Sequence, residues 1–303
     1  MTERVPKARP RNRVIVNKTI APYLFLAPFA LLFVAFLIVP LIYAFDISLY
    51  KKAMVGGVKF VGADNYIKAF ADPKFWEGVG VLFKFAFLQI PIMIATALLF
   101  ALILDSGVVW AKAFFRISFF IPYAVPAVIA TLIWSYLYGP AYGPIGQTAR
   151  YLGFEAPDFV SPEWILGSIA NIAQWQYMGY NMIIYFAALQ AIPTDLEEAS
   201  VVDGASAFAF ATRIKLPMIV PTIIVTVVFS IIGSLQLFTE PFLIQNMARS
   251  VINSNFTPNI YAYNLTFVGQ QPNYAAAISF LLGGVIAVVS YAFMLVVNRR
   301  NDR

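Results

Sequence analysis

The charged side chains best placed for chemistry lie together in one interior segment, residues 193–217. The segment holds four acids and two bases, which are Asp195, Glu197, Glu198, Asp203, Arg213 and Lys215. No charged residue occurs from 164 to 194 or from 216 to 239. A charged segment between two apolar stretches, each long enough to cross a bilayer, is typical of a loop outside the membrane.

The spacing of capping residues predicts two short helices within this loop. Thr194 and Glu197 form a T-x-x-E capping box, in which each side chain satisfies a free backbone N–H at a helix start. Gly204 is placed to end the first helix in the left-handed conformation. Ser206 is expected to cap the second helix and Pro217 to end it. Such local order favours a docking surface over a simple connection.

A second group of polar side chains lies inside the apolar segment 165–191. In a helix, one face would carry Asn171, Gln174, Met178, Asn181 and Tyr185, with Tyr177 and Tyr180 beside it. Amides and phenols donate and accept hydrogen bonds, and phenol rings stack on sugar faces, so this face suits a hydroxyl-rich solute. The same side chains can instead hold helices together by hydrogen bonds, and the sequence leaves both alternatives open.

Small residues recur along one face of the later segment 217–239. This stripe consists of Thr226, Ser230, Gly233 and Leu237, with Ser234 beside it. Small residues let two helix backbones approach closely, so we expect close helix packing there. Residues 64–70 predict a short interfacial amphipathic helix with aromatic anchors. The long, polar segment 241–273 is expected to contact a partner or a solute.

Composition places the chain in the membrane. Of its 303 residues, 60% are hydrophobic and 12% are charged, against about 25% charged in a soluble domain. The chain has no cysteine and no histidine, which excludes disulfides, thiol nucleophiles, Cys/His zinc sites and histidine acid–base chemistry. The net charge of +6 is concentrated near the N-terminus beside an apolar segment, which favours a membrane surface over nucleic acid.

Hydropathy predicts six membrane-spanning helices in a domain that extends from residue 19 to 298. The six predicted spans are 20–46, 80–104, 113–138, 165–191, 217–239 and 275–298. Residues 1–18 form a basic tail and residues 299–303 a second one, and positive charge places both in the cytoplasm. The first span is too long for a cleaved signal peptide and is expected to be retained.

The predicted spans contain no feature that would power transport. No chain of acids or histidines crosses the bilayer, which argues against proton or sodium coupling. The G-x-x-x-x-G-K-[ST] phosphate-binding loop does not occur in the sequence either. The energy for active transport must therefore come from another subunit, and residues 193–217 are the candidate contact.

The sequence of that loop resembles a known family. Its motif runs Glu198-Ala-Ser-Val-Val-Asp203-Gly204-Ala205 and then Ile214-Lys-Leu216-Pro217, which is similar to the EAA loop of binding-protein-dependent ABC importers. Supporting motifs are Trp175-x-x-x-Gly179-Tyr180, Leu189-Gln-Ala-Ile-Pro193, Arg116-x-x-Phe119-Phe120-Ile-Pro122 and Phe60-Val-Gly62-x-Asp64-Asn65-Tyr66. Together they resemble the sugar-permease, or maltose-type, branch over nearly the whole chain. The departures are Ser200 for the second alanine, and a phenylalanine at Phe210 rather than at Ala211.

The resemblance implies an all-α integral membrane protein with the six-helix transmembrane domain of a type I ABC importer. Two such permease subunits pair, usually as a heterodimer, and two ATPase subunits bind ATP and magnesium below them. A periplasmic or lipid-anchored binding protein delivers the carbohydrate. The chain itself would be neither an enzyme nor a cofactor protein, and would lie in the bacterial cytoplasmic membrane with both termini inside.

The resemblance also assigns residues to two sites. It places the ATPase contact at Glu197, Glu198, Ala199, Asp203, Gly204 and Ala205. It places the solute pathway along the polar face and a neighbouring aromatic end, at Trp134, Tyr138, Asn171, Gln174, Tyr177, Met178 and Asn181.

Three alternatives remain in view. The first is a permease for another polar solute, such as a polyol or glycerol phosphate, although a phosphate would require Lys or Arg along the pathway and the predicted spans from 165 onward have none. The second is a secondary carrier that works alone. The third, an intramembrane enzyme, lacks the paired carboxylates, histidines or cysteines that its chemistry needs.

Overall fold

The computed structural model describes residues 21–53, 57–139 and 142–301, and helices make up most of them. The predicted basic tail 1–18 lies outside the described residues. The chain divides after Ile47 into two compact units. A continuous apolar helix, Ala21–Ser48, begins in the first unit. It consists of α1 (Ala21–Phe33), the π-helical turn η1 (Val34–Ile38) and α2 (Val39–Ser48). It fits the predicted span 20–46.

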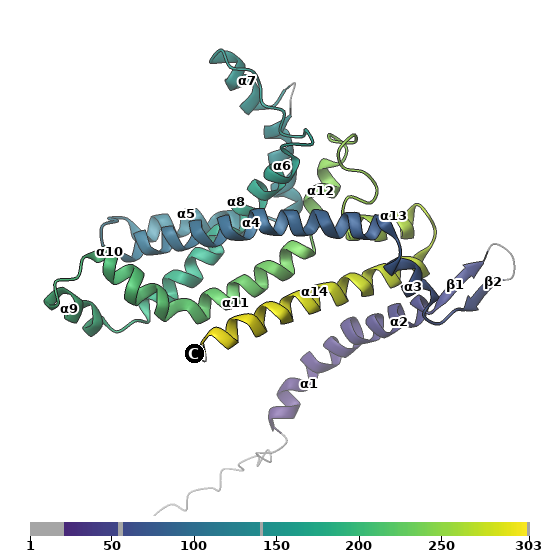
Figure 1. Cartoon of the computed structure of the whole chain (residues 1–303), viewed down its shortest axis with the longest axis horizontal. Helices are drawn as coiled ribbons and strands as arrows, with labels where there is room; N and C mark the ends of the chain where they lie inside the picture. The colour runs from purple at the N-terminus through teal and green to yellow at the C-terminus, as the bar shows by residue number, and fades with distance from the viewer. Residues whose placement is uncertain (1–20, 54–56, 140–141, 302–303) are drawn as a thin grey trace, which may run out of the picture. The chain divides into compact units, whose positions relative to one another are not determined.

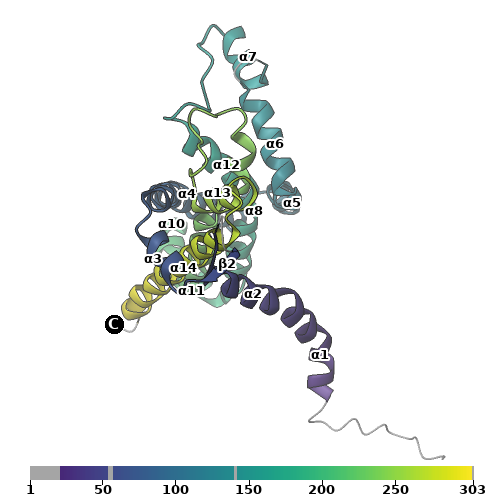
Figure 2. The same ribbon diagram turned by 90° about the vertical axis from the view of Figure 1, so that its right-hand side faces the viewer.

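Four long helices form the core of the second unit, as Figures 1 and 2 show from two directions. They are α4 (Pro73–Asp105), α8 (Ile165–Gln190), α11 (Leu216–Leu235) and α14 (Pro272–Asn301). Helix α4 packs along α8, and α11 packs against both α4 and α14. The side chains between them are large and apolar, including the fully buried Leu82, Phe85, Ile169, Ile172 and Ile278. Burial of such side chains supplies the main stabilisation of the bundle.

The predicted count of six spans is not confirmed. By length and hydropathy, the described residues contain four candidate spans, which are Ala21–Ser48, Pro73–Asp105, Ala207–Ile244 and Pro272–Val297. A fifth is counted if the bent pair α5 (Lys112–Ala124) and α6 (Ala127–Tyr138) is taken as one span. Helix α8 matches the predicted 165–191 and is long enough to cross. Its amide and tyrosine side chains make it too polar to qualify by hydropathy.

The predicted span 113–138 is broken into two helices, because α5 and α6 meet at an angle of 97°. The break falls at Val125 and Pro126. Proline has no backbone N–H, and it forces the residue before it into an extended conformation, which Val125 adopts with ψ of 126°. The freed carbonyl of Val125 accepts a hydrogen bond of 2.8 Å from the side chain of Gln176 on α8. The break is therefore stabilised by a partner from another helix.

Helix α8 crosses α5 at Gly179 with almost no space between the two backbones. A Cβ atom built at Gly179 would overlap the carbonyl group of Phe119 on α5. The crossing therefore requires a glycine, whereas Gly167 on the same helix faces open space. This close approach explains the glycine in the motif Trp175-x-x-x-Gly179.

Short elements gather at the end of the bundle where α4 begins (Figure 1). Strands β1 (Tyr50–Ala53) and β2 (Gly57–Phe60) form an antiparallel hairpin, and α3 (Asp64–Phe70) confirms the predicted helix at 64–70. Helix α13 (Pro258–Phe267) lies at this end as well. Helix α12 (Thr239–Ile244) packs against α6, and α7 (Pro144–Tyr151) projects beyond α6. The predicted polar segment 241–273 is therefore partly helical.

The side chain of Asp72 connects three helices, α4, α13 and α14. Its carboxylate caps α4 by accepting from the backbone N–H of Lys74, and it accepts hydrogen bonds from the hydroxyls of Tyr261 on α13 and Tyr274 on α14, at 2.7 and 2.8 Å. Desolvation acts to raise the pKa of Asp72, but these hydrogen bonds outweigh it and hold the pKa below the ordinary value. The carboxylate therefore stays charged and fixes the start of α4.

Candidate functional site

Helices α9 (Thr194–Val202) and α10 (Ala207–Phe210) form an exposed surface at the opposite end of the bundle (Figure 1). The side chains of Val201 and Val202 are 69% and 87% exposed, and Phe208 is 77% exposed. Glu198 and Asp203 are exposed beside them. Apolar side chains mixed with acids on a projecting loop are typical of a surface that a protein partner covers.

The predicted capping box at the start of this loop is wrong. Helix α9 begins at Thr194 with Pro193 in the cap position, and no side chain caps it. In a capping box, the glutamate must bind the backbone N–H of the cap residue, and proline has none. Glu197 instead approaches Lys215, with 3.6 Å between its carboxylate and the ammonium group.

The predicted end of α9 and start of α10 are confirmed. Gly204 adopts a φ of +74°, and its N–H donates to the carbonyl of Val201 at 3.0 Å. The N–H of Ala205 reaches the carbonyl of Ser200 at 2.9 Å, so the pair forms a complete Schellman motif. The Ser206 hydroxyl then caps α10 by accepting from the N–H of Ala209. The turn between the helices is thus fixed by local hydrogen bonds.

Pro217 does not end the second helix, contrary to the prediction. Helix α10 continues through the π-helical turn η2 (Ala211–Lys215) directly into α11. The wider π-helical turn before Pro217, in which the N–H of Leu216 bonds to the carbonyl of Ala211, accommodates the proline within this continuous helix. The loop is therefore rigidly continuous with a membrane-spanning helix.

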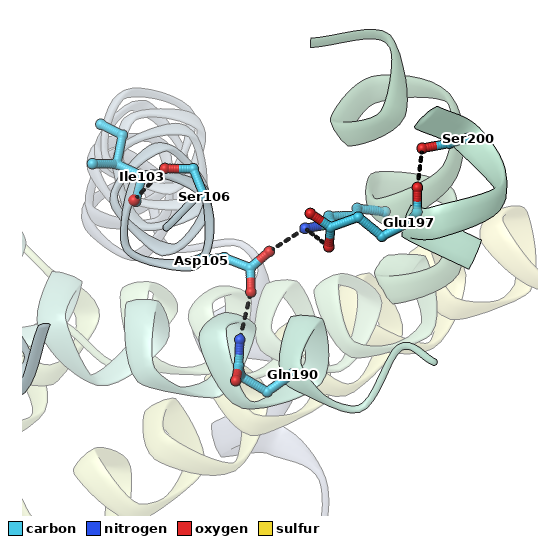
Figure 3. A network of polar contacts seen from close by, with 7 residues as sticks. Ile103, Asp105, Ser106, Gln190, Glu197 and Ser200 are labelled. Carbon is cyan, nitrogen blue, oxygen red and sulfur yellow. Dashed lines mark hydrogen bonds and ion pairs between the residues drawn. The ribbon is translucent and has the colours of Figure 1, made fainter. Parts of the chain in front are cut away.

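Lys215 ties the loop to the ends of two long helices. Its ammonium group lies 2.6 Å from the carboxylate of Asp105, the last residue of α4. The other oxygen of Asp105 accepts from the side-chain amide of Gln190 on α8 at 2.6 Å. Figure 3 shows the Asp105 carboxylate between Gln190 and the side of the loop that carries Glu197. The side chains of Lys215 and Asp105 are largely buried, at 12% and 5% exposed.

The two departures from the family motif have structural roles in this loop. Ser200 is buried, and its hydroxyl donates to the carbonyl of Glu197 at 2.8 Å. Phe210 is buried beneath the ammonium group of Lys215, 4.9 Å from the ring centre. A π-helical turn holds one residue more than an α-helical turn. The π-helical turn at 211–215 follows directly after Phe210.

A cavity of about 440 Å³ lies between α4, α8 and the part of α11 from Thr222 onward, and it extends to Glu240 at the start of α12. Its polar lining consists of Gln89, Tyr177, Tyr180, Asn181, Thr222, Thr226, Ser230, Ser234, Gln236, Thr239 and Glu240. Apolar and aromatic side chains such as Phe85 and Phe238 complete the wall. Pockets between bundle helices with a few converging polar groups are typical ligand sites.

The predicted pathway residues divide into two sets. Tyr177 and Asn181 line the cavity, and the amide of Asn181 donates to the carbonyl of Tyr177. The other five lie outside its lining, which are Trp134, Tyr138, Asn171, Gln174 and Met178.

Those five residues contact the helices around the cavity. The amide of Asn171 donates to the hydroxyl of Tyr138 at 2.8 Å, and the ring of Trp134 lies against that of Tyr138. Gln174 bonds to Thr96 on α4, and Met178 packs against a second buried cluster. The predicted polar residues of α8 therefore contact neighbouring helices in part and line the cavity in part.

The expectation of close packing along the small-residue stripe of α11 is wrong for its centre. A Cβ built at Gly233 would meet nothing within 4 Å, and Ser230 and Gly233 both line the cavity. Thr226 and Ser234 do contact other helices, through Tyr185 on α8 and Gln89 on α4. At its centre, the small side chains of the stripe leave space for the cavity and do not pack against the backbone of another described helix.

Sequence reasoning missed Lys215 and Asp105 as a pair, and Gln89 and Glu240 as cavity residues. Asp105 carried a signal, because an acid at a helix C-terminus opposes the helix dipole and calls for a cation. Glu240 carried a weaker one as an acid directly after an apolar span.

Residues 94–303 match the family described as "binding-protein-dependent transport system inner membrane component". The lactose transport system permease protein of Rhizobium radiobacter is 31% identical over 89% of this chain and 91% of its own length. The arabinooligosaccharides transport system permease protein of Bacillus subtilis is 31% identical over 90% of this chain and 87% of its own.

Solved structures give the same fold. A chain of a bacterial ABC transporter that imports the acidic polysaccharide alginate superposes with a TM-score of 0.79, at 23% identity over 93% of this chain and 98% of that one. A second structure, of the alginate transporter in complex with its pentasaccharide-bound periplasmic protein, gives a TM-score of 0.78 at 23% identity, covering 92% and 96% of the two chains. With several apolar helices and a family match over most of its length, the chain is a multi-pass membrane protein and belongs to the family of binding-protein-dependent transport system inner membrane components.

Proposed function

We propose that the chain forms half of the translocation pathway of an ATP-driven importer for carbohydrate. A second permease subunit supplies the other half, two ATPase subunits bind the surface formed by α9 and α10, and a binding protein delivers the solute. The chain neither binds ATP nor catalyses a reaction, since ATP and magnesium are held by the ATPase subunits. The residues that contact the ATPase are Glu197, Glu198, Ala199, Asp203, Gly204 and Ala205.

The observation that carries the proposal is the exposed loop and its rigid attachment. Its outer face presents Val201, Val202 and Phe208 to a partner, while Lys215 fastens its inner side to the end of α4 through Asp105. A partner that moves this surface would therefore move the membrane helices with it. Transport driven from outside the chain needs such a connection.

Carbohydrate is favoured as the solute by relatives and by the cavity. Similar permeases are named for lactose, arabinooligosaccharides and, in Mycobacterium tuberculosis, trehalose. The cavity offers amides, hydroxyls and tyrosine rings, which suit sugar hydroxyls and sugar faces. None of the described residues that line it is Lys or Arg, which counts against glycerol phosphate. A polyol remains the second candidate on the same chemistry.

In this proposal the fold completes six spans, with α8 as the polar one and α5 and α6 sharing another. Both termini then lie in the cytoplasm, together with α9 and α10. Helix α14 ends on the same side of the bundle as this loop (Figure 1), which supports that orientation.

Uptake into proteoliposomes tests the proposed function. We expect labelled sugar to enter vesicles that contain the permease pair, the ATPase pair and the binding protein, and only when ATP is supplied on the ATPase side. The matched control is the same lipid with the permease chain alone. Sugar entry with this chain alone would show a secondary carrier and overturn the proposal.

A further inference from the structure

Among the described residues that line the cavity, Glu240 is the one with a charged side chain. It lies in the first turn of α12, just after the chain leaves α11, and it is 8% exposed. Helix α12 packs against α6 and α8, so the carboxylate is enclosed by membrane helices. The Tyr177 side chain on α8 is close enough to interact with it electrostatically.

No cation balances this carboxylate in the described part of the chain. The ion pairs formed there join Lys215 to Asp105 and to Glu197, and none includes Glu240. A buried charge without a partner costs several kcal/mol. Ionisable groups inside membrane segments that carry this cost are typically functional.

The surroundings of Glu240 supply the rest of a sugar site. A carboxylate accepts hydrogen bonds through two oxygens, so it can hold two neighbouring hydroxyls of one ring. Asn181 and Gln236 add amides to the same cavity, and Tyr177 and Tyr180 add ring faces. A solute with its own negative charge would instead meet the carboxylate in a medium of low dielectric constant, where repulsion is strong.

We infer that Glu240 binds solute hydroxyls directly and restricts this permease to uncharged saccharides, excluding uronate-containing ones. The inference rests on the proposed function and names its substrate class. It separates this chain from the structurally similar alginate importer, which imports an acidic polysaccharide.

Sugar binding to the assembled detergent-solubilised complex, without its binding protein, tests the inference. The probes are lactose, trehalose and arabinotriose as neutral sugars, and digalacturonate as the anionic one. We expect the unmodified complex to gain thermal stability with at least one neutral sugar and none with digalacturonate. The variant Glu240→Gln should bind the effective neutral sugar about tenfold more weakly, because a charge-assisted hydrogen bond is replaced by a neutral one. The matched control is Glu163→Gln, the same substitution at an exposed residue outside the cavity. This variant should bind the neutral sugar as tightly as the unmodified complex does.

Several results would overturn the inference. These are stabilisation of the unmodified complex by digalacturonate, stabilisation by none of the neutral sugars, or unchanged sugar binding in Glu240→Gln. The first two need no variant, so a Glu240→Gln protein that fails to assemble leaves the test in force. ATPase stimulation by the binding protein is measured separately. If the binding protein still stimulates the ATPase but Glu240→Gln binds sugar as well as the unmodified complex does, only this inference is refuted. If the binding protein does not stimulate the ATPase of the unmodified complex at all, the proposed function is refuted.

Discussion

Replacing Gly204 by aspartate is expected to abolish the stimulation of ATPase activity by the binding protein in the reconstituted complex. Gly204 has a φ of +74°, a conformation that costs an L-residue about 1–2 kcal/mol. The new carboxylate would also lie beside Asp203 on the exposed surface. The Schellman turn would be strained and the docking surface altered in both shape and charge. Glu198→Arg should have the same effect by reversing an exposed charge without changing the backbone.

Gly153 provides a matched control for the Gly204 substitution. It too has a positive φ, of +81°, and open space around the position of a Cβ, but it follows α7, far along the chain from α9. Gly153→Asp should therefore carry a similar backbone strain and leave the stimulation intact. Full stimulation in both Gly204→Asp and Glu198→Arg would refute the assignment of this loop to the ATPase.

Replacing Lys215 by methionine is expected to lower the stability of the complex by about 3 kcal/mol, because it leaves the buried carboxylate of Asp105 without its cation. The loop should also lose its attachment to α4, so sugar uptake should fall more than ATPase activity. Chemical or thermal unfolding of the purified complex measures the first effect, and uptake per ATP hydrolysed measures the second.

Arg213→Met is the matched control for Lys215→Met. Arg213 is a basic residue in the same π-helical turn, but its side chain is exposed, so its loss should change stability by no more than about 0.5 kcal/mol. The double variant Asp105→Asn with Lys215→Met should recover most of the lost stability, since no buried charge remains. Equal effects of Lys215→Met and Arg213→Met would argue against the ion pair as the attachment.

Local rules predicted the parts of the loop that depend on neighbouring residues. Gly204 and Ser206 could be assigned from spacing because their hydrogen bonds reach only a few residues along the chain. The capping box failed for an equally local reason. The helix starts one residue earlier than expected, so the residue in the cap position is Pro193, which has no backbone N–H for Glu197 to bind.

Features that depend on distant partners could not be read in this way. The break between α5 and α6 is marked by Pro126, but prolines also occur inside continuous helices, such as Pro91 in α4. What makes a sharp bend acceptable is the amide of Gln176, 51 positions from the carbonyl it satisfies. The pairing of Asp105 with Lys215 likewise spans 110 positions.

The cavity shows the same limit for the candidate solute site. Of the seven predicted pathway residues, only Tyr177 and Asn181 line the cavity. Which side of a helix meets a cavity is decided by its neighbours. The small residues of α11 predicted a packing surface, but residue size alone does not show whether another helix fills the space beside them. At Gly233 no other described residue fills it.

Cross-linking from the loop tests the central claim, that a partner ATPase docks on α9 and α10. The chain has no native cysteine, so Val202→Cys introduces a single thiol at a site 87% exposed. Val268→Cys, at a residue 75% exposed beyond α13, provides the matched control. With a short thiol-reactive cross-linker in membranes that contain the whole complex, we expect the ATPase subunit to be captured from Val202→Cys and not from Val268→Cys. Capture of the ATPase from Val268→Cys, or from neither variant, would contradict the account.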